Sequence, residues 1–247
     1  MQADGLSFSN RFAVVYSRFI ALDFENVLAV AAGQGCVEWV LFPYIAAVER
    51  DEKDMKEWIL ASASPRRKEL LKEIVSCFEI IPAKGEEKVD EQLAPSELVK
   101  ALATQKAREV ASLPIAKGKI VLGADTVVAL GDKVLGKPKD EQDAKEMLRA
   151  LSGKTHCVYT GVCISVWDGE NRIELAQTDC TNVTFFVLSE QFIDEYVASG
   201  SPMDKAGAYG IQDGGLVEKI DGSYSNVVGL PIELCRKLVS DMGSLLS

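Results

Sequence analysis

The chain has 247 residues, of which 47% are hydrophobic, and it carries a formal net charge of −10 at pH 7. This apolar content is ample for a packed core, and the length fits one large domain or two small ones. The acidic balance argues against a nucleic acid as the main partner, since proteins that bind duplexes usually carry a basic face. Six cysteines without a C-x-x-C pair and a single histidine argue against a zinc site. Because no secretory signal is recognisable, we expect reduced thiols and a cytoplasmic location.

The first 55 residues differ in pattern from the rest and are predicted to form an N-terminal extension of unknown role. Residues 27–48 are apolar and nearly long enough for a membrane span. However, Glu38 lies near their middle, where a charge is costly. We therefore expect no membrane association, and we predict a single domain over residues 56–247.

From residue 57 onward, the pattern predicts alternating strands and helices. Strands are predicted at 58–61, 78–82, 120–130, 133–135, 155–167 and 173–188. Helices are predicted at 65–78, 95–112, 141–151 and 189–199, and from Pro231 to the C-terminus. Residues 204–229 are rich in glycine and are predicted to be irregular. Long strands, hairpins and flanking helices indicate an α/β fold whose sheet is not purely parallel.

The first motif, S-A-S-P-R-R at 62–67, directly follows the first predicted strand. Ser64 fits the N-cap of a helix, and Pro65 fits its first position. The start of a helix attracts anions, and the guanidinium groups of Arg66 and Arg67 match phosphate oxygens. Because acidic residues are usually favoured in a first turn, two arginines there suggest a bound anion. The alternative is an ordinary capped helix with solvated arginines.

Carboxylates provide the second signal. Asp125 lies within the apolar strand 120–130, where an ionised carboxylate is costly unless it is paired or bound to a metal. It is thus a candidate metal ligand or general base, against the alternative of a structural salt bridge. Glu86 and Glu87, in an acidic loop at 85–91, are candidates for further Mg²⁺ ligands, against the alternative of a solvated loop.

Two further segments carry groups suited to a nucleotide. Lys137 follows a glycine and precedes a proline, and it can serve as a point cation for phosphate unless it is simply a solvated turn lysine. Residues 204–212 contain small residues that permit close approach of a ligand, although a structural turn would also use them. Within them, Tyr209 can stack on a base, and Gln212 carries a donor and an acceptor for the edge of a pyrimidine.

Together and in this order, these blocks resemble the Maf family of nucleoside triphosphate pyrophosphatases. The resemblance spans about Trp58 to Leu238 and includes G-A-D-T-V-V at 123–128 and the blocks at 151–156 and 222–231. It implies a mixed, elongated sheet flanked by helices, with two lobes and a nucleotide-binding cleft between them, as in Maf and ITPase proteins. It also implies hydrolysis to the monophosphate and pyrophosphate with a divalent cation, Mg²⁺ or Mn²⁺. Family members are often dimers, so the resemblance also raises a homodimer as an expectation.

By this resemblance, Asp125 is the general base and a neighbour of the metal, and Lys137 contacts phosphate. The positions that the family uses for substrate choice are occupied here by Arg66, Thr126 and Gln212. The arginine and the string Y-G-I-Q resemble the branch that acts on dTTP and UTP rather than the 7-methyl-GTP branch. Asp213 departs from the pattern, because the family usually places glycine there.

The combined hypothesis is that cations hold a triphosphate while Asp125 or a metal activates a water for attack on the α-phosphorus. The residues predicted to bind substrate are Ser64, Arg66, Arg67, Thr126, Lys137, Lys205 and Gln212. The residues predicted to bind metal are Asp125, Glu86 and Glu87. A non-hydrolysing nucleotide-binding regulator of cell division and a 7-methyl-GTP-type pyrophosphatase are the alternatives. The carboxylates favour an enzyme, because a pure binder needs the cations but no base.

Overall fold

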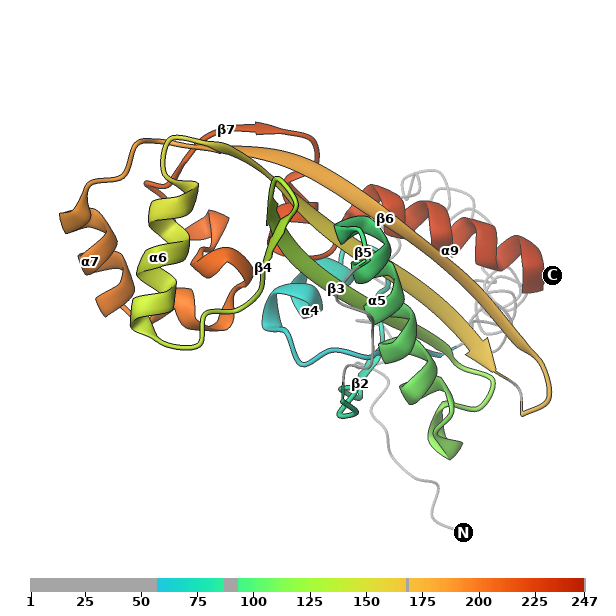
Figure 1. Cartoon of the computed structure of the whole chain (residues 1–247). Helices are drawn as coiled ribbons and strands as arrows, with labels where there is room; N and C mark the ends of the chain where they lie inside the picture. Colours follow the sequence, from blue (N-terminus) through green and yellow to red (C-terminus); the bar gives the residue numbers. More distant parts are fainter. Residues whose placement is uncertain (1–56, 87–92, 168, 247) are drawn as a thin grey trace, which may run out of the picture. The chain divides into compact units, whose positions relative to one another are not determined.

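The computed structural model describes residues 57–86, 93–167 and 169–246 (Figure 1). The predicted extension and its apolar segment lie outside these residues. The strands are β1 (Trp58–Leu60), β2 (Glu79–Ile80), β3 (Ile120–Leu130), β4 (Lys133–Leu135), β5 (Thr155–Trp167), β6 (Arg172–Phe185) and β7 (Val217–Asp221). The α-helices are α4 (Pro65–Leu71), α5 (Pro95–Ala111), α6 (Glu141–Leu151), α7 (Glu190–Ala198), α8 (Tyr224–Val228) and α9 (Ile232–Leu246). Short 3₁₀ helices are η1 (Pro114–Ala116), η2 (Ser201–Asp204), η3 (Ala206–Ala208) and η4 (Ile211–Asp213).

The seven strands of the described residues form one sheet, which is mixed as the sequence predicts, although β7 was not among the predicted strands. Its order is β2-β1-β3-β5-β6-β7, and β4 also pairs with β3. β1 runs parallel to β2 and β3, whereas β3, β5, β6 and β7 are successively antiparallel. The long strands β5 and β6 extend along the whole sheet (Figure 1). Helices α6 and α7 pack at one end of these strands, and α4 and α9 pack at the other.

One edge of β3 is left bare in the middle of the strand. β5 pairs with the other edge from Ile120 to Ala129. On the free edge, β1 pairs only with residues 120–122 and β4 only with residues 128–130. Within the described residues, positions 123–127 therefore have no neighbouring strand on this edge. The segments that leave β1 and β4 border the gap.

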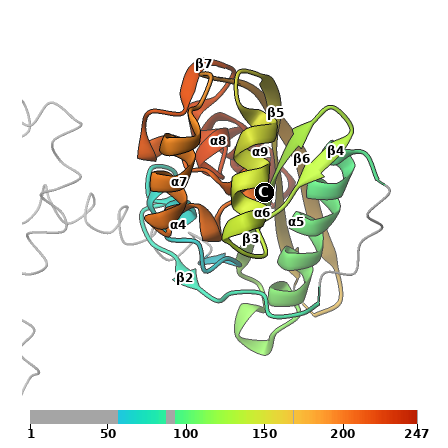
Figure 2. The same ribbon diagram turned by 60° about the vertical axis from the view of Figure 1, so that its left-hand side comes forward.

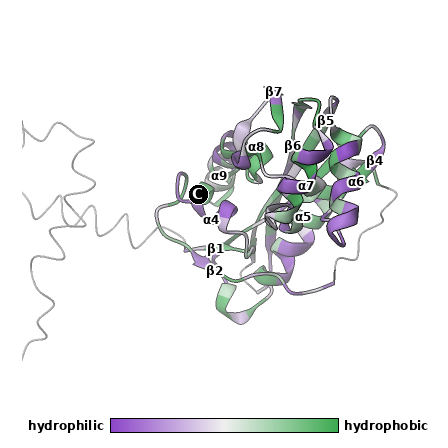
Figure 3. Ribbon diagram, turned by 90° about the vertical axis from the view of Figure 1, so that its left-hand side faces the viewer, coloured by the Kyte–Doolittle hydropathy of each residue, from purple (hydrophilic) through white to green (hydrophobic). Residues whose placement is uncertain are grey.

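Two hydrophobic clusters lie on either side of this gap. The first joins α6 and α7 to the ends of β3, β5 and β6, and the second joins β1, α4 and α9 to the other half of the sheet. Helix α6 shows how the sequence builds such a layer. Asp140 caps it by accepting a hydrogen bond from the Asp143 amide, and Ala144, Leu148 and Leu151 are buried at helical spacing. Figures 2 and 3 show α6 and α7 lying together at this end, and the colours of Figure 3 show that each helix combines hydrophilic and hydrophobic residues.

Helix α5 packs directly on the backbone of the sheet. A Cβ atom at Gly161 would lie 2.3 Å from the carbonyl oxygen of Val99, and one at Gly123 would lie 2.4 Å from that of Ala103. Both contacts are far closer than any real Cβ contact, so only glycine fits at these positions of β3 and β5. The two glycines thus set how closely α5 approaches β3.

The structure differs from the sequence prediction mainly in two segments, and in addition β6 ends at Phe185 instead of residue 188. α4 ends at Leu71 instead of residue 78, because the chain has to turn back to lay β2 parallel beside β1. Ile74, Val75 and Phe78 still pack on the core, so their apolar pattern is real although it is not helical. The segment at 204–229, predicted to be irregular, contains β7, α8 and 3₁₀ turns. No helix in the described part of the chain is long and apolar enough to cross a membrane.

We predict that Gly161→Ala lowers the free energy of unfolding by about 2 kcal/mol or more, because the new methyl group collides with the backbone of α5. The matched control is Gly243→Ala in α9, where nothing lies within 4 Å of the added Cβ. That change should stabilise the protein by up to about 1 kcal/mol, since alanine is the better helix former. Urea unfolding measures both, and a Gly161→Ala protein as stable as the wild type would contradict the packing described.

His156 predicts a dependence of stability on pH. The residue is 2% exposed, and its Nε2 lies 2.8 Å from the hydroxyl of Tyr209, while its Nδ1 has no hydrogen-bond partner among the described residues. Burial lowers the pKa of His156 from 6.5 to about 4. In this range the unfolded chain binds a proton that the folded protein does not. Stability should therefore fall by about 3 kcal/mol as the pH drops from about 6.5 to about 4.

The measurement is urea unfolding across this pH range, with His156→Gln as the comparison. The free energy of unfolding of the wild type, relative to that of His156→Gln, should fall as the pH drops through that range and should be constant outside it. A constant difference would show that the histidine is not buried in its neutral form.

Candidate active site

A cavity of about 950 Å³ opens at the bare edge of β3, and its walls come from the first hydrophobic cluster, the start of α4 and one side of α5. Its volume is in the range of small-molecule sites. All eight residues that the sequence predicts as substrate-binding or catalytic line it. They are Ser64, Arg66, Arg67, Asp125, Thr126, Lys137, Lys205 and Gln212. The predicted cleft between two lobes is thus present, and residues distant in the sequence share it.

The cavity concentrates positive charge in an acidic protein. Among the described residues, five cationic side chains line it, namely Arg66, Arg67, Lys106, Lys137 and Lys205. Three carboxylates of the same described ranges line it, namely Asp125, Asp132 and Asp204. An excess of cations in one concave site, within a chain of net charge −10, favours a compact polyanion as the ligand.

Arg67 joins three segments that meet at the cavity. Its Nε donates to the carbonyl oxygen of Gly229 at 2.9 Å, and its Nη2 donates to Oγ1 of Thr126 at 3.0 Å. Its Nη1 donates to Oγ of Ser62 at 3.3 Å. Ser64 caps α4 as predicted, accepting a hydrogen bond from the Arg67 amide. The guanidinium of Arg67 is therefore held by protein groups, and it ties the end of β1 to β3 and to the turn before α9.

Arg66 is held differently, through a carboxylate on the opposite wall. Its Nη1 lies 3.0 Å from Oδ2 of Asp204, and Lys205 Nζ lies 2.9 Å from Oδ1 of the same residue. Burial raises the pKa of Asp204, but the hydrogen bonds from Lys205 and Arg66 outweigh it and hold that pKa below its usual value. One carboxylate thus holds two of the predicted substrate-binding cations side by side.

Asp125 forms an ion pair with Lys106 of α5, which the sequence reasoning missed. Lys106 Nζ binds Asp125 Oδ1, and the two side chains are only 21% and 14% exposed. The sequence does contain a sign that Lys106 is partly buried. Lys106 follows Leu98 and Leu102 at steps of four, so it lies on the apolar face of the predicted helix. A lysine in such a stripe needs a buried partner, and the close approach of α5 over Gly161 supplies Asp125.

Asp125 and Thr126 are adjacent in a strand, so their side chains point to opposite faces of the sheet. Both nevertheless line the cavity, because no strand covers this edge of β3 and the cavity extends round it. On the face opposite Asp125, Oγ1 of Thr126 lies 2.9 Å from Oγ1 of Thr160, whose hydroxyl donates to the carbonyl oxygen of Asn226. Thr126 is thus fixed by protein groups, and its position in the wall is set by the core.

Tyr209 and Gln212 occupy the wall formed by residues 204–212. Tyr209 is 5% exposed, and its ring packs edge-to-face against Phe185 and His156. It therefore contributes an edge of the cavity wall, and the predicted role of stacking on a base does not suit so buried a ring. Gln212 belongs to the 3₁₀ turn η4 and lines the cavity directly.

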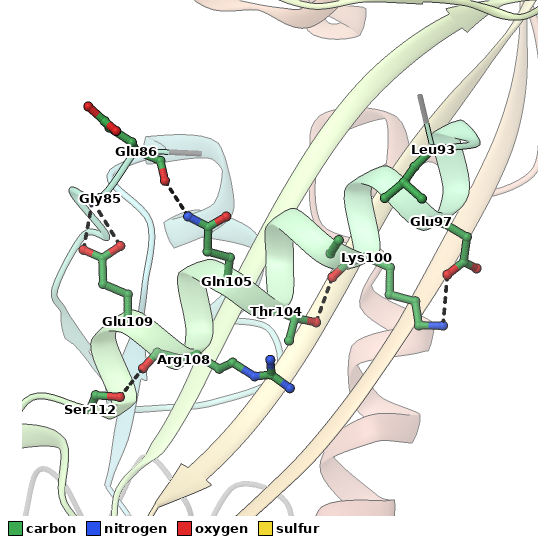
Figure 4. Close-up of a pocket in the computed structure, with 11 residues that line it drawn as sticks. Gly85, Glu86, Leu93, Glu97, Lys100, Thr104, Gln105, Arg108, Glu109 and Ser112 are labelled. Atoms are coloured by element: carbon green, nitrogen blue, oxygen red, sulfur yellow. Dashed lines mark hydrogen bonds and ion pairs between the residues drawn. The ribbon is translucent and has the colours of Figure 1, made fainter. Parts of the chain in front are cut away.

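Glu86 does not line this cavity. It borders a second hollow along the outer side of α5, where its side chain points away from the helix (Figure 4). The loop is fixed there because Gln105 Nε2 donates to the carbonyl oxygen of Glu86 at 2.5 Å and Glu109 accepts from the Gly85 amide. In the same hollow, Lys100 forms an ion pair with Glu97, and Arg108 forms one with Glu174 of β6. Glu87 lies outside the described residues.

The profile of the family described as Maf-like protein matches residues 57–242. The chain belongs to the Maf-like family. It is 50% identical over 192 residues to a dTTP/UTP pyrophosphatase of Agathobacter rectalis, covering 72% of this chain and 93% of the relative. It is 49% identical over 194 residues to a dTTP/UTP pyrophosphatase of Bacillus cereus, covering 77% and 93%.

Among solved structures, a HAM1 protein from Coxiella burnetii matches this Maf-like protein with a TM-score of 0.45 and 16% identity. The match covers 76% of this chain and 100% of that one.

The site of this Maf-like protein offers few ligands for a resident metal. Within the described ranges, no three His, Cys, Asp or Glu side chains are grouped to hold one. Asp125 is the carboxylate that lies deep in the cavity at the bare edge of β3. Mg²⁺ commonly uses one or two carboxylates together with phosphate oxygens of the substrate. The donor set therefore fits a cation that enters with a phosphate ligand, and it does not fit a closed protein cage.

The two adjacent arginines should differ in their effect on stability. Arg67→Gln should lower the free energy of unfolding by about 2 kcal/mol, because it removes the bonds that join three segments of the core. Arg66→Gln should cost less than about 1 kcal/mol, since its ion pair with Asp204 is partly exposed. Urea unfolding of both variants is the measurement. Equal losses would contradict the separate roles assigned to the two guanidinium groups.

Proposed function

We propose that this protein hydrolyses nucleoside triphosphates to the monophosphate and pyrophosphate, with dTTP and UTP as preferred substrates. The observation that carries the proposal is one cavity in which the Asp125–Lys106 pair faces the remaining cations. Relatives that are about half identical over most of the chain are dTTP/UTP pyrophosphatases, which supports the same substrates here.

The cations of the cavity hold the phosphate chain. A triphosphate carries about four negative charges near neutral pH, so its binding depends on neutralising them. Arg66 and Lys205 share the carboxylate of Asp204 in the described structure, and both are placed to bind phosphate oxygens. Lys137, which follows the end of β4 and lines the cavity, adds a third cation. Because Arg67 is held by protein groups, its role is to position Ser62, Thr126 and the turn at Gly229.

Asp125 acts as the general base. Lys106 binds Oδ1 and fixes the carboxylate, and the other oxygen accepts a proton from the attacking water. The water oxygen forms a bond to the α-phosphorus, and the bond between that phosphorus and the oxygen bridging to the β-phosphate breaks. Pyrophosphate departs with the bridging oxygen, and its charge is balanced by the cations of the cavity.

Asp125, together with phosphate oxygens of the substrate, would hold a divalent cation, Mg²⁺ or Mn²⁺. When bound, such an ion neutralises phosphate charge and makes the phosphorus easier to attack.

Arg66, Thr126 and Gln212 are proposed to select the base. Gln212 presents an amide with both a donor and an acceptor to the cavity, which matches the adjacent carbonyl and N–H groups of uracil and thymine. Thr126, fixed by Arg67 and Thr160, sets the shape of the wall.

Asp125→Asn should lower turnover of UTP by a factor of about 10² or more, because the amide cannot accept the proton. The assay is release of UMP and pyrophosphate. The control is Asp194→Asn, which removes a carboxylate of α7 that is 56% exposed and pairs with Lys145 outside the cavity. A rate near that of the wild type in Asp125→Asn would refute the assignment of the base.

The same assay separates the alternatives. In ¹⁸O-labelled water, attack on the α-phosphorus places the label in UMP, whereas label in pyrophosphate would mean attack on the β-phosphorus. Binding of UTP without product would instead support a nucleotide-binding regulator. A strong preference for 7-methyl-GTP would overturn the substrate choice.

A further inference from the structure

We propose that Tyr196 and Asp213 are positioning residues that hold the turn carrying Gln212 in the orientation that selects the base. The inference rests on the proposed function and extends it. Neither residue lines the cavity, whereas Gly210, Ile211 and Gln212 do. The two residues therefore lie behind the wall that the substrate contacts.

Both ends of the turn are attached to one phenol group. The amide of Gly210 donates to the hydroxyl of Tyr196 at 3.0 Å, and that hydroxyl donates to Oδ2 of Asp213 at 2.5 Å. The turn is closed by a hydrogen bond from the Asp213 amide to the carbonyl oxygen of Gly210. Gln212 lies between these two attached ends. Because Tyr196 belongs to α7, whose Ile193 and Val197 are buried, the turn is anchored to a packed helix.

Asp213 also links the turn to a cation of the cavity. Its Oδ2 accepts a hydrogen bond from Ser201 Oγ at 2.7 Å and lies 4.0 Å from Lys205 Nζ, which also donates to Ser201 Oγ. Burial raises the pKa of Asp213, but the hydrogen bonds from Tyr196 and Ser201 and the nearby positive charges outweigh it and lower that pKa. The carboxylate is thus held ionised behind the wall. Its negative charge is stabilised by these partners.

The packing around Gly210 shows that the arrangement is tight. A Cβ atom there would lie 2.7 Å from Cε of Lys205 and 2.9 Å from Oδ2 of Asp213. Glycine at this position lets both charged groups lie against the backbone of the turn. Asp213, the residue that departs from the family pattern, therefore helps to hold the turn that carries Gln212.

The test uses Tyr196→Phe, which removes the hydroxyl and keeps the ring in α7. Without its anchor the turn samples other conformations, so ordering it on binding weakens the interaction with the base. For UTP and dTTP, KM should rise about tenfold while kcat changes less than about threefold. For GTP, which does not use the proposed contact with Gln212, kcat/KM should change less than about twofold.

Asp213 provides a second, independent variant. Asp213→Ala should reproduce the tenfold effect on KM, and Asp213→Asn, which keeps an oxygen facing Tyr196, should have a smaller one. The double variant Tyr196→Phe/Asp213→Ala should be no worse than either single variant, because both changes release the same turn. Tyr224→Phe is the control, since its half-exposed ring does not line the cavity.

Equal losses for UTP and GTP, or additive losses in the double variant, would overturn the inference and show a general structural role. Calorimetry with the α,β-imido analogues of UTP and GTP measures the preference for UTP over GTP as a ratio of affinities, without hydrolysis. Failure of the wild type to release pyrophosphate would reject the proposed function. An unchanged ratio of analogue affinities in Tyr196→Phe would reject the positioning role.

Discussion

The close contact between α5 and the sheet is the constraint on which the site depends. Glycines at 123 and 161 let the backbone of α5 rest on β3 and β5, with no side chain between them. This approach places Lys106 against Asp125, so that a carboxylate inside an apolar strand gains a counter-charge. Any side chain at either glycine would separate the pair, and the candidate base would then be an unpaired charge at the edge of the core.

The uncovered middle of the β3 edge makes the Lys106–Asp125 pair part of a site. β1 and β4 share one edge of β3 but leave its middle uncovered, so the segments that follow both strands meet beside Asp125. Cations from these segments would repel one another if they were not compensated. Asp204 holds Arg66 and Lys205 together, and protein carbonyl and hydroxyl oxygens hold Arg67. The cavity is thus organised before a polyanion binds, which reduces the cost of ordering it on binding.

The sequence predicted the long elements well and the supports of the site poorly. β3, β4, β5 and α6 have the predicted bounds because they carry long periodic patterns or clear caps. β7, α8 and the 3₁₀ turns are too short for periodicity to show, and α4 is cut short by the topology of the sheet. Motif residues such as Arg66 and Gln212 were found because their chemistry is visible in one segment. The partnership of Lys106 with Asp125, the shared Asp204, and the link from Tyr196 to Asp213 join segments far apart in the chain, so local patterns do not reveal them.

The central claim is that Asp125 and Lys106 act as one unit in the reaction. The most direct measurement is a double-mutant cycle of Asp125→Asn and Lys106→Met, with single-turnover release of pyrophosphate from UTP. If Lys106 works by holding the carboxylate, the double variant should be about as slow as Asp125→Asn alone. Multiplicative losses, or a Lys106→Met protein as fast as the wild type, would contradict the account.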